Sequence, residues 1–173
     1  GYCVFNDVAV AIRSLERDGR ISRAVVIDLD VHQGNGTARI FEGDPAIYTF
    51  SMHGAGNYPF HKEQSRRDVE LADGTADEAY LAQLDQHLDP ALDEARPELV
   101  VYIAGADPYH GDRLGRLSLS IEGLLSRDER VFGACRDRGL PVAMVLGGGY
   151  AVNLDDIVTI HANTVRALLR RHG

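Results

Sequence analysis

The side chains best suited to chemistry stand at alternate positions of an otherwise apolar stretch. Within residues 24–36, AVVIDLDVHQGNG, Asp28, Asp30 and His32 are two apart, so in an extended strand they point to the same face. Two carboxylates and an imidazole are costly to bury together unless a cation compensates their charge. Carboxylate oxygen combined with imidazole nitrogen favours zinc or another divalent transition metal over calcium or magnesium. The spacing therefore predicts a strand that holds a metal ion.

A structural interpretation of the same stretch stays open. The Asp-x-Asp pair could simply cap the loop that follows the strand, although His32, in phase with both carboxylates, favours the metal. Two carboxylates and one imidazole make three protein ligands, which is the number that leaves an open position in catalytic zinc sites.

Polar groups also follow the other apolar runs of the chain. These groups are Ser51-x-His53, Gly105-Ala106-Asp107 and the triple glycine before Tyr150. In parallel α/β sheets such groups meet outside the carboxyl ends of the strands. The glycines let the backbone approach a substrate closely, and the Tyr150 hydroxyl can donate a hydrogen bond to a developing oxyanion. The other histidines are predicted to be structural or surface residues.

Strands and helices must alternate along the chain to position these groups. Four strands are predicted, from Ala24 through His32 and at 46–52, 99–104 and 141–146, with a helical turn at 37–41 and a long loop at 54–67. Helices are predicted after N-caps at Asn6, Ser120 and Asn153, after a further capping box at Ser126, and from a capping box at Thr75 to Ala95 with a break or kink at Pro90. This alternation predicts an α/β fold with parallel strands and right-handed crossovers.

Composition limits the classes of function. The chain has 173 residues, of which 45% are hydrophobic, so a single domain with a sizeable core is expected. A net charge of −8 argues against direct binding of nucleic acid and favours a cationic partner. Two cysteines without C-x-x-C spacing indicate a reducing compartment, and a cytoplasmic location is predicted. No apolar run reaches the ~18 residues of a membrane span, so no membrane association is predicted.

The motifs VIDLDVHQGNG, GADPYHGDRLG and LGGGY, in this order and spacing, resemble the histone deacetylase family, which has the arginase/deacetylase fold. The resemblance covers essentially the whole chain, and RRDVEL and GDRLG are most similar to class IV and bacterial members. It implies a three-layer α/β sandwich around a mostly parallel sheet that is incomplete at the N-terminus. It also implies that residues 1–173 are the C-terminal portion of a single deacetylase catalytic domain whose upstream part is absent.

The resemblance further implies roles for individual residues. Asp30, His32 and Asp107 would bind Zn²⁺, with Fe²⁺ as the alternative ion, and Tyr150 would polarise the acyl carbonyl. Asp28 and Asn35 would support a catalytic His-His pair that the family places before Gly1 and that this chain does not contain. A structural K⁺ or Na⁺ would be held by Asp28, Asp30, His32, Ser51 and Met52, and a second such ion by Phe41, Asp44 and Ile47. The acyl-lysine channel would be lined by Gly1, Tyr2, Tyr58 and Gly148.

The function implied by the resemblance is zinc-dependent hydrolysis of an amide. A metal-activated water would remove acetyl or other acyl groups from lysine in a protein or from an acylated small amine, and no oligomeric state is predicted. Without the His-His pair, the 173 residues alone are expected to hydrolyse poorly. A non-catalytic acyl-lysine binding module is the alternative. A remote alternative is a haloacid dehalogenase-type phosphatase, which also has Asp-x-Asp after a strand, although His32 stands where that family prefers Thr or Val and Lys62 is the only lysine.

Overall fold

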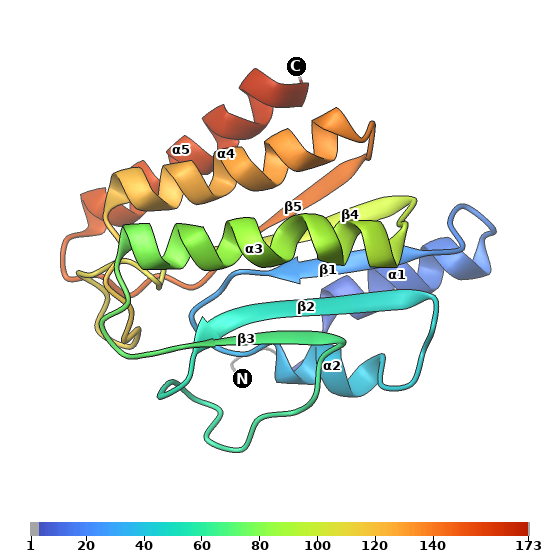
Figure 1. Cartoon of the computed structure of the whole chain (residues 1–173), viewed down its shortest axis with the longest axis horizontal. Coiled ribbons are helices and arrows are strands. Elements are labelled where there is room, and N and C mark those ends of the chain that lie inside the picture. Colours follow the sequence, from blue (N-terminus) through green and yellow to red (C-terminus); the bar gives the residue numbers. More distant parts are fainter. Residues whose placement is uncertain (1–3, 173) are drawn as a thin grey trace.

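One sheet of five parallel strands lies at the centre of the computed structural model, which describes residues 4–172 (Figure 1). The strands are β1 (Ala24–Asp28), β2 (Ile47–Gly54), β3 (Arg67–Leu71), β4 (Leu99–Gly105) and β5 (Val142–Gly147). Their order across the sheet is β3-β2-β1-β4-β5. The central strand is therefore β1, and its neighbours β2 and β4 follow it in the chain through crossover connections.

Helices cover both faces of this sheet (Figure 1). Helices α1 (Asp7–Arg17) and α2 (Asn35–Ile40) lie on one face, and α3 (Asp77–Ala95), α4 (Ile121–Asp137) and α5 (Leu154–His172) lie on the other. The predicted three-layer α/β sandwich is thereby confirmed, and the sheet is entirely parallel.

The two faces of β1 explain why residues 24–27 are all apolar. Val25 and Ile27 belong to the core beneath α3, α4 and α5, whereas Ala24 and Val26 belong to a second core with Ile12 of α1. Successive side chains point to opposite faces of a strand, so a strand covered by helices on both sides needs apolar residues at every position.

The structure confirms the predicted N-caps of two helices. The Asn6 side chain accepts a hydrogen bond from the backbone N–H of Ala9 at 2.9 Å and caps α1. The Ser120 hydroxyl accepts one from Gly123 at 2.9 Å and caps α4. These side chains satisfy amide groups that have no partner inside the first turn of a helix.

Other predicted elements were wrong. The Thr75 capping box does not form, because α3 begins after Ala76 and the Thr75 hydroxyl instead donates to the Ala72 carbonyl at 2.7 Å. Ser126 starts no new helix, since it lies inside α4. Helix α3 continues through Pro90, which is on the exposed side, where the carbonyl that loses its partner can bind water.

The fifth strand, β3, was also missed. Its sequence RDVEL has only two buried apolar residues, Val69 and Leu71, which is too short an alternation to stand out from the predicted loop before it. It pairs with β2, with Met52 opposite Val69.

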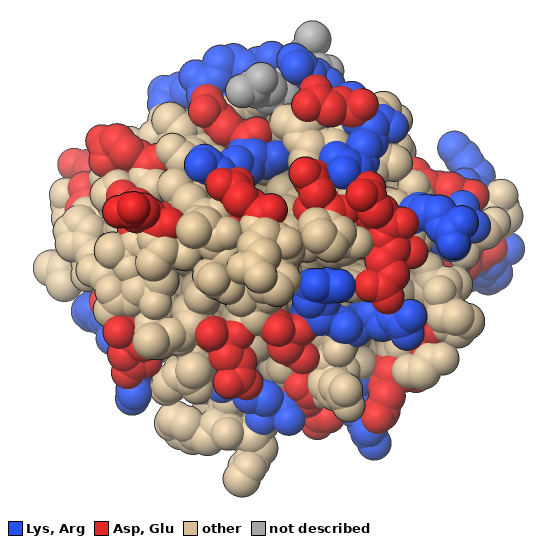
Figure 2. Space-filling view, viewed as in Figure 1, with Lys and Arg blue, Asp and Glu red and all other residues tan. Residues whose placement is uncertain are grey.

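Acidic residues of α3 are exposed but paired with arginines in α4 and at its C-cap. Arg130 lies 2.7 Å from Asp85, and Arg138 lies 3.0 Å from Asp89. Figure 2 shows acidic and basic side chains interspersed on the face that is turned to the viewer. Within residues 4–172, no helix has the length and apolar character needed to cross a membrane.

Candidate metal centre

The central strand ends earlier than predicted, and this early end shapes the site. β1 stops at Asp28, so Asp30 and His32 lie in the bend after it rather than on one face of a strand. The Asp28 carboxylate accepts a hydrogen bond from the Asp30 N–H at 3.1 Å, and the Asp30 carboxylate accepts one from the His32 N–H at 2.9 Å. Such bonds from Asp to an amide two residues ahead compete with strand pairing. The two acidic side chains therefore turn the chain out of the sheet.

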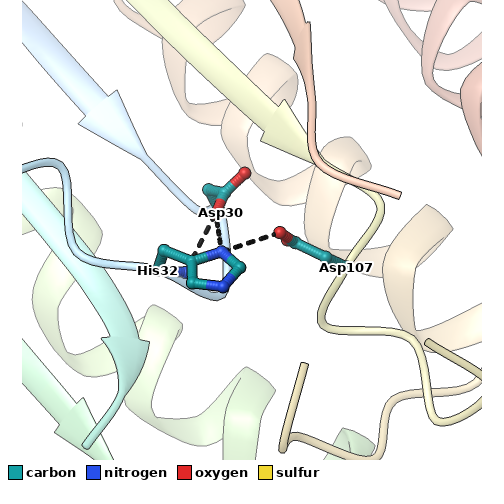
Figure 3. A group of neighbouring side chains, drawn as sticks. All are labelled: Asp30, His32 and Asp107. Atoms are coloured by element: carbon teal, nitrogen blue, oxygen red, sulfur yellow. Dashed lines mark hydrogen bonds and ion pairs between the residues drawn. The ribbon is translucent and has the colours of Figure 1, made fainter. Parts of the chain in front are cut away.

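Three predicted metal ligands nevertheless meet at this point (Figure 3). The Nδ1 atom of His32 lies 3.0 Å from an oxygen of Asp30 and 3.1 Å from an oxygen of Asp107. One donor atom from each of the three residues lies within 4.8 Å of the others. An ion placed among these atoms could contact one nitrogen and two carboxylate oxygens, which is a donor set typical of zinc.

Asp107 reaches the site because its strand is the neighbour of β1. Residue Asp28 at the end of β1 is opposite Ile103 of β4, and Asp107 follows two residues after β4 ends. The Asp107 side chain is 1% exposed, and its second oxygen accepts a hydrogen bond from the Val31 N–H at 2.9 Å. That bond fixes the orientation of the carboxylate toward the bend.

The site concentrates negative charge around one imidazole. Hydrogen bonds from the imidazole to the carboxylates of Asp107 and Asp30 raise the pKa of His32 to about 10. Burial, together with the charge of Asp30, raises the pKa of the Asp107 carboxyl to about 7. Burial and the charge of Asp30 also raise the pKa of Asp28. The surrounding structure thus favours a positive charge at the position where the three donor atoms converge.

The charge state of His32 leads to a prediction about protons. A metal ligand must be neutral imidazole, so an ion that binds at about pH 8 has to displace the His32 proton. We expect roughly one proton to be released per Zn²⁺ bound and affinity to rise with pH up to about 10. Calorimetric titrations in two buffers of different ionisation enthalpy measure this release, and a binding heat independent of the buffer would contradict it.

Two glycines leave room for the metal-binding carboxylates of Asp30 and Asp107. A Cβ atom at Gly105 would lie 2.7 Å from the Cα of Asp30, and one at Gly148 would lie 2.2 Å from the carboxyl carbon of Asp107. Gly148 also has a φ of +29°, which L side chains rarely adopt. The triple glycine predicted to admit a substrate therefore also makes room for a metal ligand.

Replacing Gly148 by Ala should consequently displace Asp107. We expect Gly148→Ala to lower Zn²⁺ affinity by at least the roughly 10- to 100-fold seen when neighbours of metal ligands are changed. The matched control is Gly133→Ala in α4, where a Cβ meets nothing within 4 Å. The control should bind metal normally and unfold at a slightly higher temperature, since Ala stabilises a helix by about 0.5–1 kcal/mol over Gly. Equal zinc affinity of the two variants would show that Asp107 can move without loss.

The backbone of Tyr150 is hydrogen-bonded to the loop that carries Asp107. Its backbone N–H donates to the Asp112 carboxylate at 2.5 Å, and its carbonyl accepts from the Arg113 guanidinium at 3.0 Å. The residue is 43% exposed. Asp112 and Arg113 were not predicted as site residues. Both lie in the GDRLG motif, which could have drawn attention to them, but their spacing alone does not indicate a role.

The residues predicted to hold monovalent ions fall into two groups. Asp28 and Ser51 are opposite each other on β1 and β2, and the Ser51 hydroxyl is 2.9 Å from Nδ1 of the buried His53. At the second group, the Phe41 carbonyl accepts from the Asp44 N–H at 3.0 Å, and the Asp44 carboxylate pairs with Arg13 at 2.8 Å. Ion binding at these groups, which also include Met52 and Ile47, stays a prediction.

The structure describes two of the four predicted channel residues, Tyr58 and Gly148. Gly1 and Tyr2 lie outside the described residues. Tyr58 is 55% exposed, with Phe60 edge-on at 6.1 Å between ring centroids. The ammonium group of Lys62 donates to the carbonyls of Asn57 and Pro59 at 2.7 and 2.5 Å and so stabilises the conformation of this loop.

Asn35, which was predicted to support the His-His pair, starts α2, and its N–H donates to the Gln33 carbonyl at 2.8 Å.

Comparison with known proteins gives one consistent result. The sequence pattern of the histone deacetylase domain matches residues 1–165. An uncharacterized protein of Picosynechococcus is 46% identical over 167 residues, which are 96% of this chain and 56% of that protein. Histone deacetylase 2 of Arabidopsis thaliana is 40% identical over 153 residues, which are 87% of this chain and 40% of that protein.

Solved structures agree with the sequence matches. The HDA15 HD domain superposes with a TM-score of 0.81 at 26% identity, covering 99% of this chain and 51% of that one. An acetylpolyamine aminohydrolase from Burkholderia pseudomallei shares the fold with a TM-score of 0.80 at 23% identity, covering 97% of this chain and 50% of that one. The chain spans about half the length of these relatives.

Proposed function

Because the chain belongs to the histone deacetylase family, we propose that it supplies the metal-binding part of a zinc-dependent deacetylase. The single observation that carries this proposal is the convergence of Asp30, His32 and Asp107 where β1 and β4 end. The reaction is hydrolysis of the amide bond between an acyl group and an amine. The donor set supports Zn²⁺, with Fe²⁺ as the alternative ion.

Each group of this site has a separate task in the proposed reaction. A divalent ion held by Asp30, His32 and Asp107 would supply Lewis acidity for the acyl carbonyl and for water. The Tyr150 hydroxyl donates a hydrogen bond to the carbonyl oxygen and stabilises the negative charge that develops there. Asp28 holds the backbone of Asp30 in place through the bond to its N–H. The resemblance assigns proton transfer to a His-His pair preceding Gly1, so we propose that turnover requires the complete protein.

The proposed substrates are acyl-lysine in a protein and an acylated small amine. The relatives include proteins named histone deacetylases and an acetylpolyamine aminohydrolase, which act on these two classes by name. The net charge of −8 supports a substrate that is cationic or that becomes cationic when its amine is released.

The test is release of acetate by the complete protein from an acetyl-lysine peptide and from an N-acetylated diamine. We expect turnover that is lost on treatment with a chelator and restored by Zn²⁺, because the carbonyl is no longer polarised without the ion. An Asp107→Asn variant is the control for adventitious metal. Turnover that survives chelation would refute the metal-dependent mechanism, and tight binding of the acetylated peptide without acetate release would favour the non-catalytic alternative.

A further inference from the structure

A fully buried arginine lies directly beneath the two segments that carry the metal ligands. Arg127 of α4 is 0% exposed. Its Nη1 donates to the backbone carbonyl of Gly105 at 2.7 Å and to that of Leu29 at 3.2 Å. Leu29 immediately precedes Asp30, and Gly105 is two residues before Asp107.

These two carbonyls lie at the point where β1 and β4 part. The last contact of the ladder is the Leu29 N–H, which donates to the Ile103 carbonyl at 3.1 Å. Beyond it, the Asp30 N–H is bound by the Asp28 side chain. Buried carbonyl groups need donors, and the guanidinium supplies them across the gap between the strands.

The charge of Arg127 is compensated on the side away from the metal site. Its Nε and Nη2 lie 2.9 and 2.8 Å from one oxygen of Asp128, which is 1% exposed. That carboxylate also accepts hydrogen bonds from the Tyr102 hydroxyl at 2.5 Å and the Thr164 hydroxyl at 2.6 Å. Side chains of β4, α4 and α5 thus hold the guanidinium in a single orientation.

We propose that Arg127 is a positioning residue that sets the separation between Asp30 and Asp107 by clamping the backbone on both sides of the strand gap. This inference rests on the proposed metal site. Stability alone is a poor reason for such a residue, because a buried ion pair can often be replaced by apolar side chains at no cost in stability. A planar guanidinium, in contrast, can bond two carbonyls and a carboxylate at the same time.

The test is titration of the complete protein with Co²⁺, monitored by visible absorption, which reports affinity and coordination geometry. Arg127→Lys keeps the charge beside Asp128 but cannot reproduce the fork of donors. We expect it to weaken Co²⁺ binding by about 10- to 100-fold and to alter the absorption spectrum. The matched control is Val131→Ala, one turn further along α4, which loosens the core without touching either carbonyl and should leave affinity and spectrum unchanged. Wild-type affinity and spectrum in Arg127→Lys would overturn the proposal.

A second pair of variants decides the matter if Arg127→Lys does not fold. Thr164→Val removes the hydroxyl that holds Asp128, whereas Thr164→Ser retains it. We expect the Val variant to bind Co²⁺ about 2- to 10-fold more weakly than the Ser variant, because the anchor of the guanidinium is loosened. Equal affinities would overturn the role of Arg127. Failure of the complete wild-type protein to bind Co²⁺ would instead refute the metal site itself, so the two failures are distinguishable.

Discussion

Asp107→Asn and His32→Ala should each abolish stoichiometric binding of Zn²⁺. Both changes remove one of three converging ligands, and the expected loss exceeds the roughly 10- to 100-fold caused by changing groups around a metal site. Asn is nearly the same shape as Asp and keeps an oxygen for the Val31 N–H, so the Asp107→Asn protein should stay folded. Metal analysis of the purified variants after dialysis measures the effect.

The control for this experiment is His110→Ala. His110 lies on the same loop as Asp107, but it is exposed and its ring contacts the Leu119 carbonyl at 3.2 Å rather than the ligand group. It should retain one Zn²⁺ per chain. Zinc retained by both ligand variants would rule out the proposed ligand set, whereas loss in the His110 variant would extend the site into this loop.

Tyr150→Phe should lower kcat of the complete protein by about 10²- to 10³-fold, the scale of deleting one donor to an oxyanion. The hydrogen bond from the hydroxyl strengthens as charge develops on the carbonyl oxygen, so its loss affects the transition state more than substrate binding. Phe removes only the hydroxyl, and the backbone bonds of residue 150 to Asp112 and Arg113 are retained. The variant should therefore keep its zinc and its fold.

Steady-state kinetics on an acetyl-lysine peptide separate the two possible roles of this tyrosine. A reduced kcat with little change in KM is expected for stabilisation of the oxyanion. Unchanged kcat with a raised KM would assign Tyr150 to substrate binding and would exclude it as the oxyanion donor.

The order of elements could be predicted because it depends on short patterns, whereas spacing alone grouped Asp28, Asp30 and His32, and the choice of Asp107 as the third ligand came from the family resemblance. Apolar runs followed by Asp30 and Asp107 identify two strand ends, and parallel strands bring such ends together. The predicted local geometry was wrong, because the strict alternation of apolar and polar residues suggested that the strand continues to His32. The strand pairing ends because side chains bind the backbone, as where the Asp28 carboxylate accepts a hydrogen bond from the Asp30 N–H. Such a bond cannot be recognised from the alternation of apolar and polar residues.

Support for the ligands was less predictable than the ligands themselves. Arg127 and Asp128 look like part of a capping box in the sequence, and their burial depends on α4 packing over the ends of β1 and β4. The hydrogen bond from the Tyr150 N–H to the Asp112 carboxylate likewise joins two loops that are distant in the chain. Such contacts are set by tertiary packing, for which local propensity gives no signal.

The division of the ligand set between β1 and β4 also determines when during folding the site can exist. His32 and Asp107 are 75 residues apart in the chain and meet only after a long crossover has closed. Contacts of this kind are entropically expensive and form slowly. An ion that needs all three side chains would find only Asp30 and His32 close together in a chain whose central strands are still unpaired. A divalent ion held by all three side chains would therefore act on the finished fold rather than nucleate folding, and it would lower the rate of unfolding.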